Sequence, residues 1–430
     1  MSAVIGILNK HGIALAADSA VTISGGGNRK ILNSANKIFT LSKHHPIGIM
    51  IYSSAEFMGT PWEIIAKMYR EQLGTKSFKK VDDYRKDFIK YLKDNEFFSD
   101  EQDQLQTLSN FFYTCLNQLN REAIHNNEKL LIKPDKQNTD KIYSLIEKRA
   151  EHYITQFKDE KPCNDFKNYT FKTFQGFSKK TFGQVTEVLF EELDHQPTQK
   201  LKALLHEFLF LCLKSKSLLE LQPFSGLVFV GYGDAQIYPH LVPVNIMLAV
   251  QGKLRACVDE NKSAHISNKM HSVISPFAQT DVIDTILRGV DPDLERIYQE
   301  NFSAFLIKYN NFIAEKADNE SKELADTIRS LNVNELTRSY FRDVNQMQQT
   351  TYIDKMLQTV SSLPKEDLAE MAESLIYLTY LKRRITFAEE SVGGPVDVAL
   401  ITKGDGFIWM KRKHYFNPEL NHHFFKGYLK

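Results

Sequence analysis

The chain has 430 residues, of which 42% are hydrophobic and 25% charged, and its 54 basic and 53 acidic side chains leave a net charge of +1. This composition is typical of a globular protein with a sizeable core. The balanced charge gives no global field that would favour nucleic acid or an anionic membrane as a partner. Four cysteines without a C-x-x-C pair argue against a zinc or redox motif, and a reduced compartment fits them best.

The first residues do not have the pattern of a secretory signal. The apolar stretch after Met1 lacks a basic segment before it and is interrupted by Asn9-Lys10-His11. Nowhere does an apolar run approach the roughly 18 residues of a membrane-spanning helix. We therefore expect a cytoplasmic protein.

Residues 1–75 read as a group of short strands followed by a helix. Runs rich in apolar and β-branched residues, with turns at Gly12 and at the Gly25-Gly26-Gly27 cluster, predict strands over Ala3–Leu8, Ile13–Ala17, Lys37–Leu41 and Ile47–Tyr52. Ser53-Ser54 are plausible caps of a helix that runs to Gly74, and Glu56 is placed to complete a capping box.

The remaining chain alternates between helical and strand-rich segments. Helical periodicity dominates 76–222 and 291–361, which we interpret as two large insertions. Strands return in 223–290, where a strand passes into a helix near Pro276, and 362–412 reads as a helix, a Gly-Gly-Pro turn and two strands hinged at Gly404-Asp405-Gly406. An aromatic and basic tail covers 413–430. This order predicts an α+β fold with a layered core.

A set of residues at the N-terminus carries a resemblance. Ser2 precedes the strand "AVIGIL", Gly12 forms a turn, "IALAADS" ends with Asp18, and "NKIF" contains Lys37. Together with "EESVGGPVDVALITKGDGFIWM" near the C-terminus, this order resembles proteasome β-type subunits, which are N-terminal-nucleophile hydrolases. The chain is similar to a divergent bacterial-type homologue with helical insertions. The resemblance implies a four-layer αββα sandwich and a homo-oligomeric ring or double ring.

The chemistry of these residue types supports the same interpretation. A serine hydroxyl is a weak nucleophile that needs a nearby base. If Met1 is removed, the α-amine of Ser2, with a pKa of about 7.7–8.0, can take that role. Lys37 would favour the deprotonated hydroxyl, and Asp18 would keep the lysine charged and oriented.

The resemblance also implies supporting residues. The backbone amide of Ser53 falls where the family stabilises the oxyanion, and Glu389 with Ser391 matches its acidic–Ser–Gly turn with a shifted register. The predicted catalytic residues are therefore Ser2, Asp18, Lys37, Ser53, Glu389 and Ser391. Neither a cofactor nor a metal is expected.

Three functions stay open at this point. The first is hydrolysis of amide bonds in a peptide or protein substrate, with an ATP-dependent unfoldase as an unidentified partner. The second is an amidase or acylase for a small non-peptide amide. The third is a catalytically inactive assembly protein, in which Ser2 is an ordinary second residue, Asp18 a turn residue and Lys37 a solvated edge residue.

Overall fold

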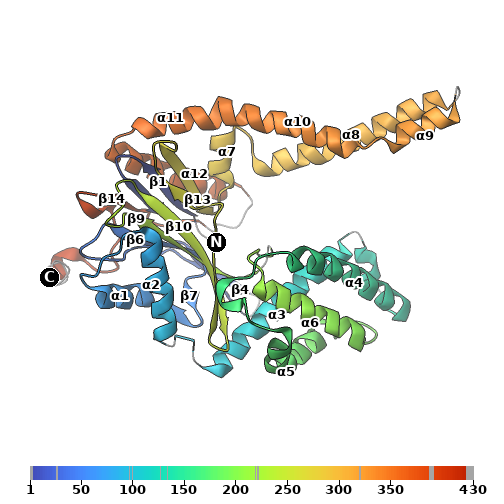
Figure 1. Cartoon of the computed structure of the whole chain (residues 1–430), viewed down its shortest axis with the longest axis horizontal. Helices are drawn as coiled ribbons and strands as arrows, with labels where there is room; N and C mark the ends of the chain where they lie inside the picture. The colour runs from blue at the N-terminus through green and yellow to red at the C-terminus, as the bar shows by residue number, and fades with distance from the viewer. Residues whose placement is uncertain are drawn as a thin grey trace. The chain divides into compact units, whose positions relative to one another are not determined.

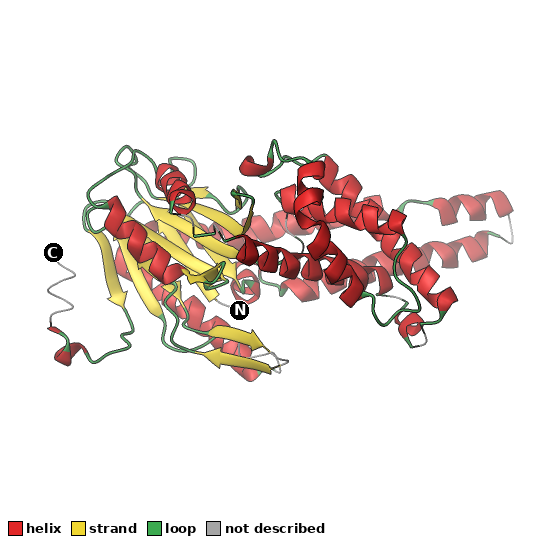
Figure 2. Cartoon of the chain, turned by 90° about the horizontal axis from the view of Figure 1, so that it is seen from below, coloured by secondary structure: helices red, strands yellow, loops and turns green. Residues whose placement is uncertain are grey.

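The computed structural model describes residues 3–25, 28–95, 97–98, 100–125, 127–132, 134–217, 219, 222–318, 321–386 and 392–422 (Figure 1). It divides into two compact units, which are described separately: unit 1 comprises Met1–Ile38 and His265–Lys430, and unit 2 comprises Phe39–Ala264. Both units combine helices with antiparallel sheet, which confirms the α+β class (Figure 2). The four-layer stacking concerns both units together and stays a prediction.

Unit 1 is built on a five-stranded sheet with the order β13-β1-β2-β14-β15. Its strands are β1 (Ala3–Asn9), β2 (Ile13–Ala17), β13 (Ser272–Ala278), β14 (Asp397–Thr402) and β15 (Gly406–Lys411). All neighbours run antiparallel. The first strand of the chain is therefore a central strand, and β1 and β2 are buried along their whole length. A separate hairpin joins β3 (Val21–Gly25) to β4 (Asn28–Leu32).

The turn between β1 and β2 is fixed by the side chain of Asn9. Its Oδ1 accepts hydrogen bonds from the backbone amides of His11 and Gly12, which is the local bonding that favours asparagine in turns. Its Nδ2 donates to the carbonyl oxygens of Val360 and Leu363, at 2.9 and 2.8 Å. One buried amide thus sets the hairpin and ties it to the helices that follow in the sequence.

The helices of unit 1 are α7 (Asp281–Arg288), α8 (Pro292–Ala317), α9 (Lys322–Ser330), α10 (Val333–Gln348), α11 (Asp354–Ser362) and α12 (Lys365–Ile385). A single π-helical turn, η3 (Gln349–Ile353), joins α10 to α11. Helix α12 packs on β1, β2 and β14, and its apolar face forms the core of the unit with their side chains. In the described ranges, no helix of either unit is long and apolar enough to cross a membrane.

Unit 2 contains a sheet with the order β11-β10-β9-β6-β5, and β12 pairs with β10. Its strands are β5 (Ile38–Thr40, at the boundary of the units), β6 (Ile47–Ser53), β9 (Ser225–Gly231), β10 (His240–Val250), β11 (Lys253–Val258) and β12 (Ala264–His265). Helices α1 (Trp62–Leu73) and α2 (Val81–Asp94) pack against the sheet through a core rich in aromatic rings.

The segment after residue 76, interpreted above as an insertion, is largely helical. It forms α2 and four further helices, α3 (Glu101–Ile124), α4 (Lys136–Lys158), α5 (Phe171–Leu189) and α6 (Gln199–Lys214). Four of these N-termini are capped by the side chain of the preceding residue: Asp100, Asp135, Thr170 and Thr198. The four helices share one core, which also includes Met247 and Leu248 of β10.

The predicted start of the first helix is wrong. Ser53 ends β6 with a left-handed φ of 66°, and a small hairpin of β7 (Glu56–Phe57) and β8 (Thr60–Pro61) comes before α1. Met58 also has a positive φ. Because these residues leave the helical region of backbone space, the helix begins only at Trp62.

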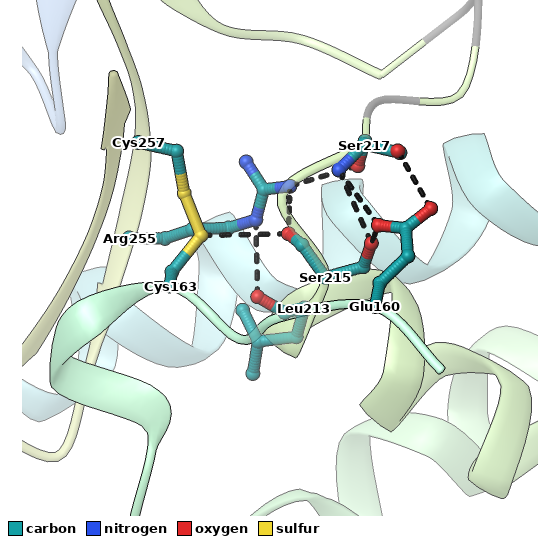
Figure 3. Close-up of a disulfide and its surroundings, with 7 residues drawn as sticks. All are labelled: Glu160, Cys163, Leu213, Ser215, Ser217, Arg255 and Cys257. Atoms are coloured by element: carbon teal, nitrogen blue, oxygen red, sulfur yellow. Dashed lines mark hydrogen bonds between the residues drawn. A yellow bond between two sulfur atoms is a disulfide. The ribbon is translucent and has the colours of Figure 1, made fainter. Parts of the chain in front are cut away.

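A disulfide links Cys163, which comes before a short 3₁₀ turn, to Cys257 of β11 (Figure 3). Nothing in their spacing predicts the bond, because 94 residues separate them. Beside it the fully buried Arg255 donates from Nε to the carbonyl of Leu213 at 3.0 Å and from Nη2 to the carbonyl of Ser215 at 2.8 Å. The guanidinium thus satisfies carbonyls at the end of α6, and burial lowers its pKa to about 10.

Candidate active site

Asp18 directly follows the last residue of β2. Its carboxylate accepts more hydrogen bonds than any other described at this end of the unit 1 sheet. Oδ1 accepts from the backbone amide of Ala3 at 2.9 Å and from Lys37 Nζ at 2.5 Å. Oδ2 accepts from the backbone amides of Ala20 at 3.1 Å and Gly393 at 3.2 Å. The side chain is 1% exposed, so these four donors replace water around a buried charge.

Lys37 is the ionic partner of Asp18 and is itself 5% exposed. Burial lowers the pKa of Lys37 below its ordinary value, and the Asp18 carboxylate opposes that shift. Two further charges have opposite effects on the pKa of Lys37: Lys413 lowers it, and Asp397 raises it. The result is a lysine held in place by one carboxylate and easier to deprotonate than a solvated one.

The segment that precedes β14 holds Asp18 and its neighbour Ser19. The amide of Ser19 donates to the carbonyl of Gly393 at 3.0 Å, and its hydroxyl donates to the carbonyl of Pro395. Gly394 has a φ of +76°, and a Cβ at this position would lie 2.8 Å from the Cβ of Asn33. Only glycine fits this turn, so the Gly-Gly-Pro sequence has a structural role beside the carboxylate.

A second buried ion pair lies at the same end of the strands, where β2 ends and β14 begins. Asp397, at the start of β14, is opposite Ala17 of β2. Its Oδ1 accepts from the backbone amide of Lys413 at 2.9 Å, and its Oδ2 forms an ion pair with Lys413 Nζ. The Asp397 side chain is 3% exposed. The ends of neighbouring strands thus bring two carboxylate–lysine pairs to one edge.

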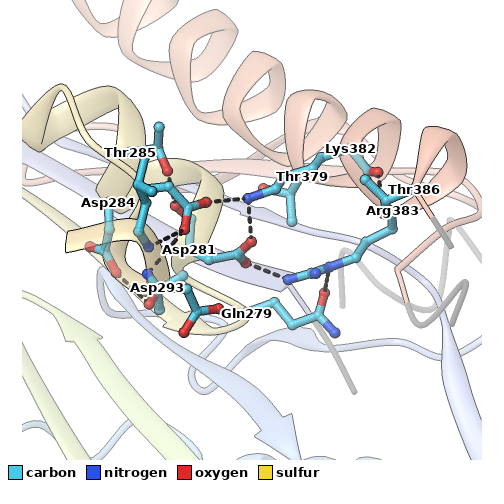
Figure 4. Close-up of polar contacts among 12 residues, drawn as sticks. Gln279, Asp281, Asp284, Thr285, Asp293, Thr379, Lys382, Arg383 and Thr386 are labelled. Carbon is cyan, nitrogen blue, oxygen red and sulfur yellow. Dashed lines mark hydrogen bonds and ion pairs between the residues drawn. The ribbon is translucent and has the colours of Figure 1, made fainter. Parts of the chain in front are cut away.

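The opposite flank of β1 carries a third polar group. Ala3 pairs with Ala278, the last residue of β13, which has a left-handed φ of 66°. The next residue, Gln279, accepts from Arg383 Nε at 2.7 Å (Figure 4). Arg383 also pairs with Asp281, which Lys382 contacts at 2.9 Å. The left-handed residue Ala278 thus ends β13 opposite the first described residue of β1, and the polar network begins at the residue that follows it.

The structure brings together two of the six predicted catalytic residues, Asp18 and Lys37. Ser2, Glu389 and Ser391 lie outside the described residues. Ser53 belongs to unit 2, and it ends a strand rather than opening a helix. The physical reason for its predicted role, an amide at a helix N-terminus, therefore does not hold at this residue.

Sequence reasoning missed Asp397, Lys413 and the amide of Gly393. A signal for Asp397 was present, because an aspartate inside the apolar run "VDVALIT" must be paired if it is buried. Lys413 was assigned to the basic tail, and nothing local distinguishes it from the surface lysines around it. Among the described residues, no group of three or more His, Cys, Asp or Glu side chains has an arrangement that could hold a metal ion.

No protein-family model and no curated protein matches the chain. Solved structures that match include an Anbu (Gly-1) mutant from Hyphomicrobium sp. strain MC1, at 7% identity and a TM-score of 0.28. Another is Anbu (ancestral beta-subunit) from Yersinia bercovieri, at 8% identity and a TM-score of 0.26. Both alignments cover 99% of this chain and 94% of the other.

These comparisons correct the family expectation. Proteasome β-type membership predicts a match to a family model, and none is found. Structural similarity with TM-scores below 0.3 does not assign a chain to a family. The identification as a proteasome β-type N-terminal-nucleophile hydrolase is therefore contradicted, and the function must be argued from the geometry of unit 1 alone.

Proposed function

We propose that the chain is an N-terminal serine hydrolase that cleaves amide bonds, with Ser2 as nucleophile once the residue before it has been removed. The observation that supports this most directly is the shared oxygen of Asp18, which accepts from both the amide of Ala3 and the ammonium of Lys37. The nitrogen of Ala3 is bonded directly to the carbonyl carbon of Ser2. Ser2 is therefore joined through its peptide bond to the Ala3 amide, which contacts the Asp18–Lys37 pair.

The proposed reaction uses the terminal Ser2 together with Lys37 and Asp18. The amine of a terminal Ser2 removes the hydroxyl proton, since its pKa of about 7.7–8.0 leaves much of it neutral near physiological pH. The hydroxyl oxygen attacks the amide carbonyl, an ester forms, the C–N bond breaks, and the proton passes to the leaving amine. Water then hydrolyses the ester and restores the serine.

Lys37 and Asp18 have separate roles in this scheme. The positive charge of Lys37 favours the alkoxide that forms on the serine as its proton leaves. Asp18 keeps the lysine in one position, because its other three acceptor contacts are to backbone amides that cannot rotate away. A peptide or protein is the substrate class that we propose.

The experiment is covalent labelling of the full chain with a β-lactone probe, followed by peptide mass spectrometry. The expected result is an acyl adduct on a peptide that begins with Ser2. Ser2→Ala should abolish the adduct, and Lys37→Met should slow it by at least tenfold. Ser34→Ala is the matched control, since this exposed serine lies near Lys37 in the sequence and should leave the rate unchanged.

Two outcomes would overturn the proposal. One is labelling of a chain that still carries Met1, because the base would then be an amide nitrogen. The other is labelling that survives Ser2→Ala. Absence of any adduct on correctly processed protein would favour the inactive assembly protein. If labelling succeeds, a comparison of peptide and small acyl-amide substrates separates the peptidase from the amidase.

A further inference from the structure

We propose that α8, α9 and α10, here named the helical arm, form an interface between two copies of this chain. The arm presents one apolar face, and that face pairs with the same face of the second copy. This inference does not depend on the proposed function, because it uses no residue of the candidate active site.

Helices α8 and α10 lie side by side in the arm (Figure 1), and an inner seam of side chains joins them. Phe302 of α8 stacks on Tyr340 of α10 with ring centroids 4.7 Å apart, and Ser303 contacts Thr337. Residue numbers rise along α8 as they fall along α10, so the two helices are antiparallel. Near the tip, α9 packs on α8, and Ala314 and Ala325 are fully buried.

A second row of apolar side chains on α8 does not enter this seam. These side chains are spaced three, four or seven residues apart, which places them on one stripe of a helix. Each has between 41% and 60% of its surface exposed. They are Leu294, Tyr298, Phe305, Tyr309 and Phe312.

Helix α10 has a comparable stripe with Leu336 and Met347, which are 58% and 57% exposed, and the ring of Tyr340 leaves 50% of its surface exposed beside them although it also stacks on Phe302. A helix turns by about 100° per residue, so the exposed stripe of each helix lies roughly 80–110° around the helix axis from the residues that face the other helix. The rotation from these residues to the stripe has the same sense in both helices. Because the helices run antiparallel, equal rotation in the same sense places both stripes on one side of the pair. The arm therefore has a single two-helix apolar face, to which Leu324 of α9 adds its exposed side chain.

The size of this face fits a specific interface. A half-exposed aromatic or large aliphatic side chain presents on the order of 100 Å², so the face exposes about 800 Å². That is the area which each partner contributes to a standard protein–protein interface, and it exceeds the largest apolar patch of a typical monomer. Aromatic residues and methionine with few charges are also the composition of interface centres.

The second copy is the occupant that these features favour. A two-helix layer buries only one side of each helix, whereas two such layers face to face form a four-helix bundle with a common core. An isologous contact of this kind needs no complementary charge. A cation does lie beside this face, since Lys316 Nζ is 5.6 Å from the centroid of the Phe312 ring. An anionic membrane would require a basic surround, but Glu300, Glu335 and Asp343 are distributed along the same helices as the arginines and lysines.

The test is the mass of the full chain by sedimentation velocity across a range of micromolar concentrations. We expect an even-numbered assembly that dissociates into halves when Tyr309→Ser or Phe305→Ser is introduced, with at least a tenfold rise in the dissociation constant. Ile307→Ser is the matched control. Ile307 is 50% exposed, as Tyr309 is 51% exposed, but it lies on the far side of α8 and should leave assembly unchanged.

Far-ultraviolet circular dichroism of each variant checks that the helix content of the chain is unchanged. The proposal is overturned if the unchanged chain is a monomer throughout the range, or if Tyr309→Ser and Phe305→Ser both assemble as the unchanged chain does. It is also overturned if Ile307→Ser disrupts assembly as strongly as they do. Flotation of monomeric protein with anionic vesicles would assign the face to a membrane instead.

Discussion

Lys37 Nζ lies 2.5 Å from Asp18 Oδ1, and both side chains are almost completely removed from solvent. A buried pair of this kind costs desolvation energy, which its mutual attraction and its additional hydrogen bonds offset. Asp18 has three such additional bonds, all from backbone amides of different segments. The pair therefore links the start of β1, the end of β2 and the turn before β14.

Removal of one partner should be much more damaging than removal of both. Asp18→Asn leaves the Lys37 ammonium buried without a counter-charge, and we expect a loss of about 3–5 kcal/mol in the free energy of unfolding. The double variant Asp18→Asn/Lys37→Met should recover part of that loss. Urea unfolding followed by fluorescence measures both. Equal stability of the two variants would show that the charge of Lys37 is not the source of the cost.

Gly394→Ala should destabilise unit 1 by about 2 kcal/mol or more. An alanine there adopts a left-handed φ of +76° and places Cβ 2.8 Å from the Cβ of Asn33. Gly404→Ala is the control, because its Cβ meets nothing within 4 Å, and the change should stay within about 0.5 kcal/mol. Thermal unfolding of the two variants measures this difference, and equal melting temperatures would contradict the assigned turn.

Reduction of the Cys163–Cys257 bond should lower the melting temperature of unit 2. The bond closes a segment of 94 residues, and loss of such a link typically costs about 2–5 kcal/mol. The double variant Cys163→Ala/Cys257→Ala should melt at the lower temperature with or without reductant. A non-reduced peptide map that shows both cysteines free would contradict the assignment.

His206 should make unit 2 less stable in mild acid. Burial among aromatic rings lowers the pKa of His206 to about 4 from an ordinary value of 6.5. Between these pH values the unfolded chain binds the additional proton. Stability should therefore fall from pH 6.5 to about 4, by at most about 3 kcal/mol, and this contribution should change no further below that.

The variant His206→Phe tests this dependence. It removes the titrating group and keeps the stack on Phe182, and Ser178 retains its hydrogen bond to the carbonyl of Phe174. Urea midpoints measured between pH 4 and 7 should then vary less than those of the unchanged chain. A slope identical to that of the unchanged chain would assign the acid sensitivity to other groups.

The positions of β1 and β2 could be predicted well, whereas the β3–β4 hairpin and the contacts between distant segments could not. Apolar runs and the Asn9–Gly12 turn located β1 and β2 to within one residue, because both strands are buried on both faces and carry a strong local pattern. The helix after Ser53 was misplaced because left-handed residues at 53 and 58 leave no mark in a capping motif. The π-helical turn at 349–353 interrupts a continuous helical periodicity and was equally invisible.

The candidate site shows the same division. Asp18 and Lys37 could be named through the resemblance, from "IALAADS" and "NKIF", and their opposite charges suit a pair that stabilises a nearby hydroxyl. Asp397 and Lys413 could not be paired, because nothing in the sequence states that β14 lies beside β2. The structure places Lys37 in contact with Asp18, and the comparisons do not support the family itself.

The central position of β1 determines when unit 1 can fold. The neighbours of β1 are β2, which follows at once, and β13, which is synthesised more than 250 residues later. The strand β14, which pairs with β2, comes later still. Unit 2 is contiguous, from Phe39 to Ala264, and can collapse while the ribosome is still translating the rest. The first hairpin therefore gains its other sheet partners only after most of the chain has been synthesised.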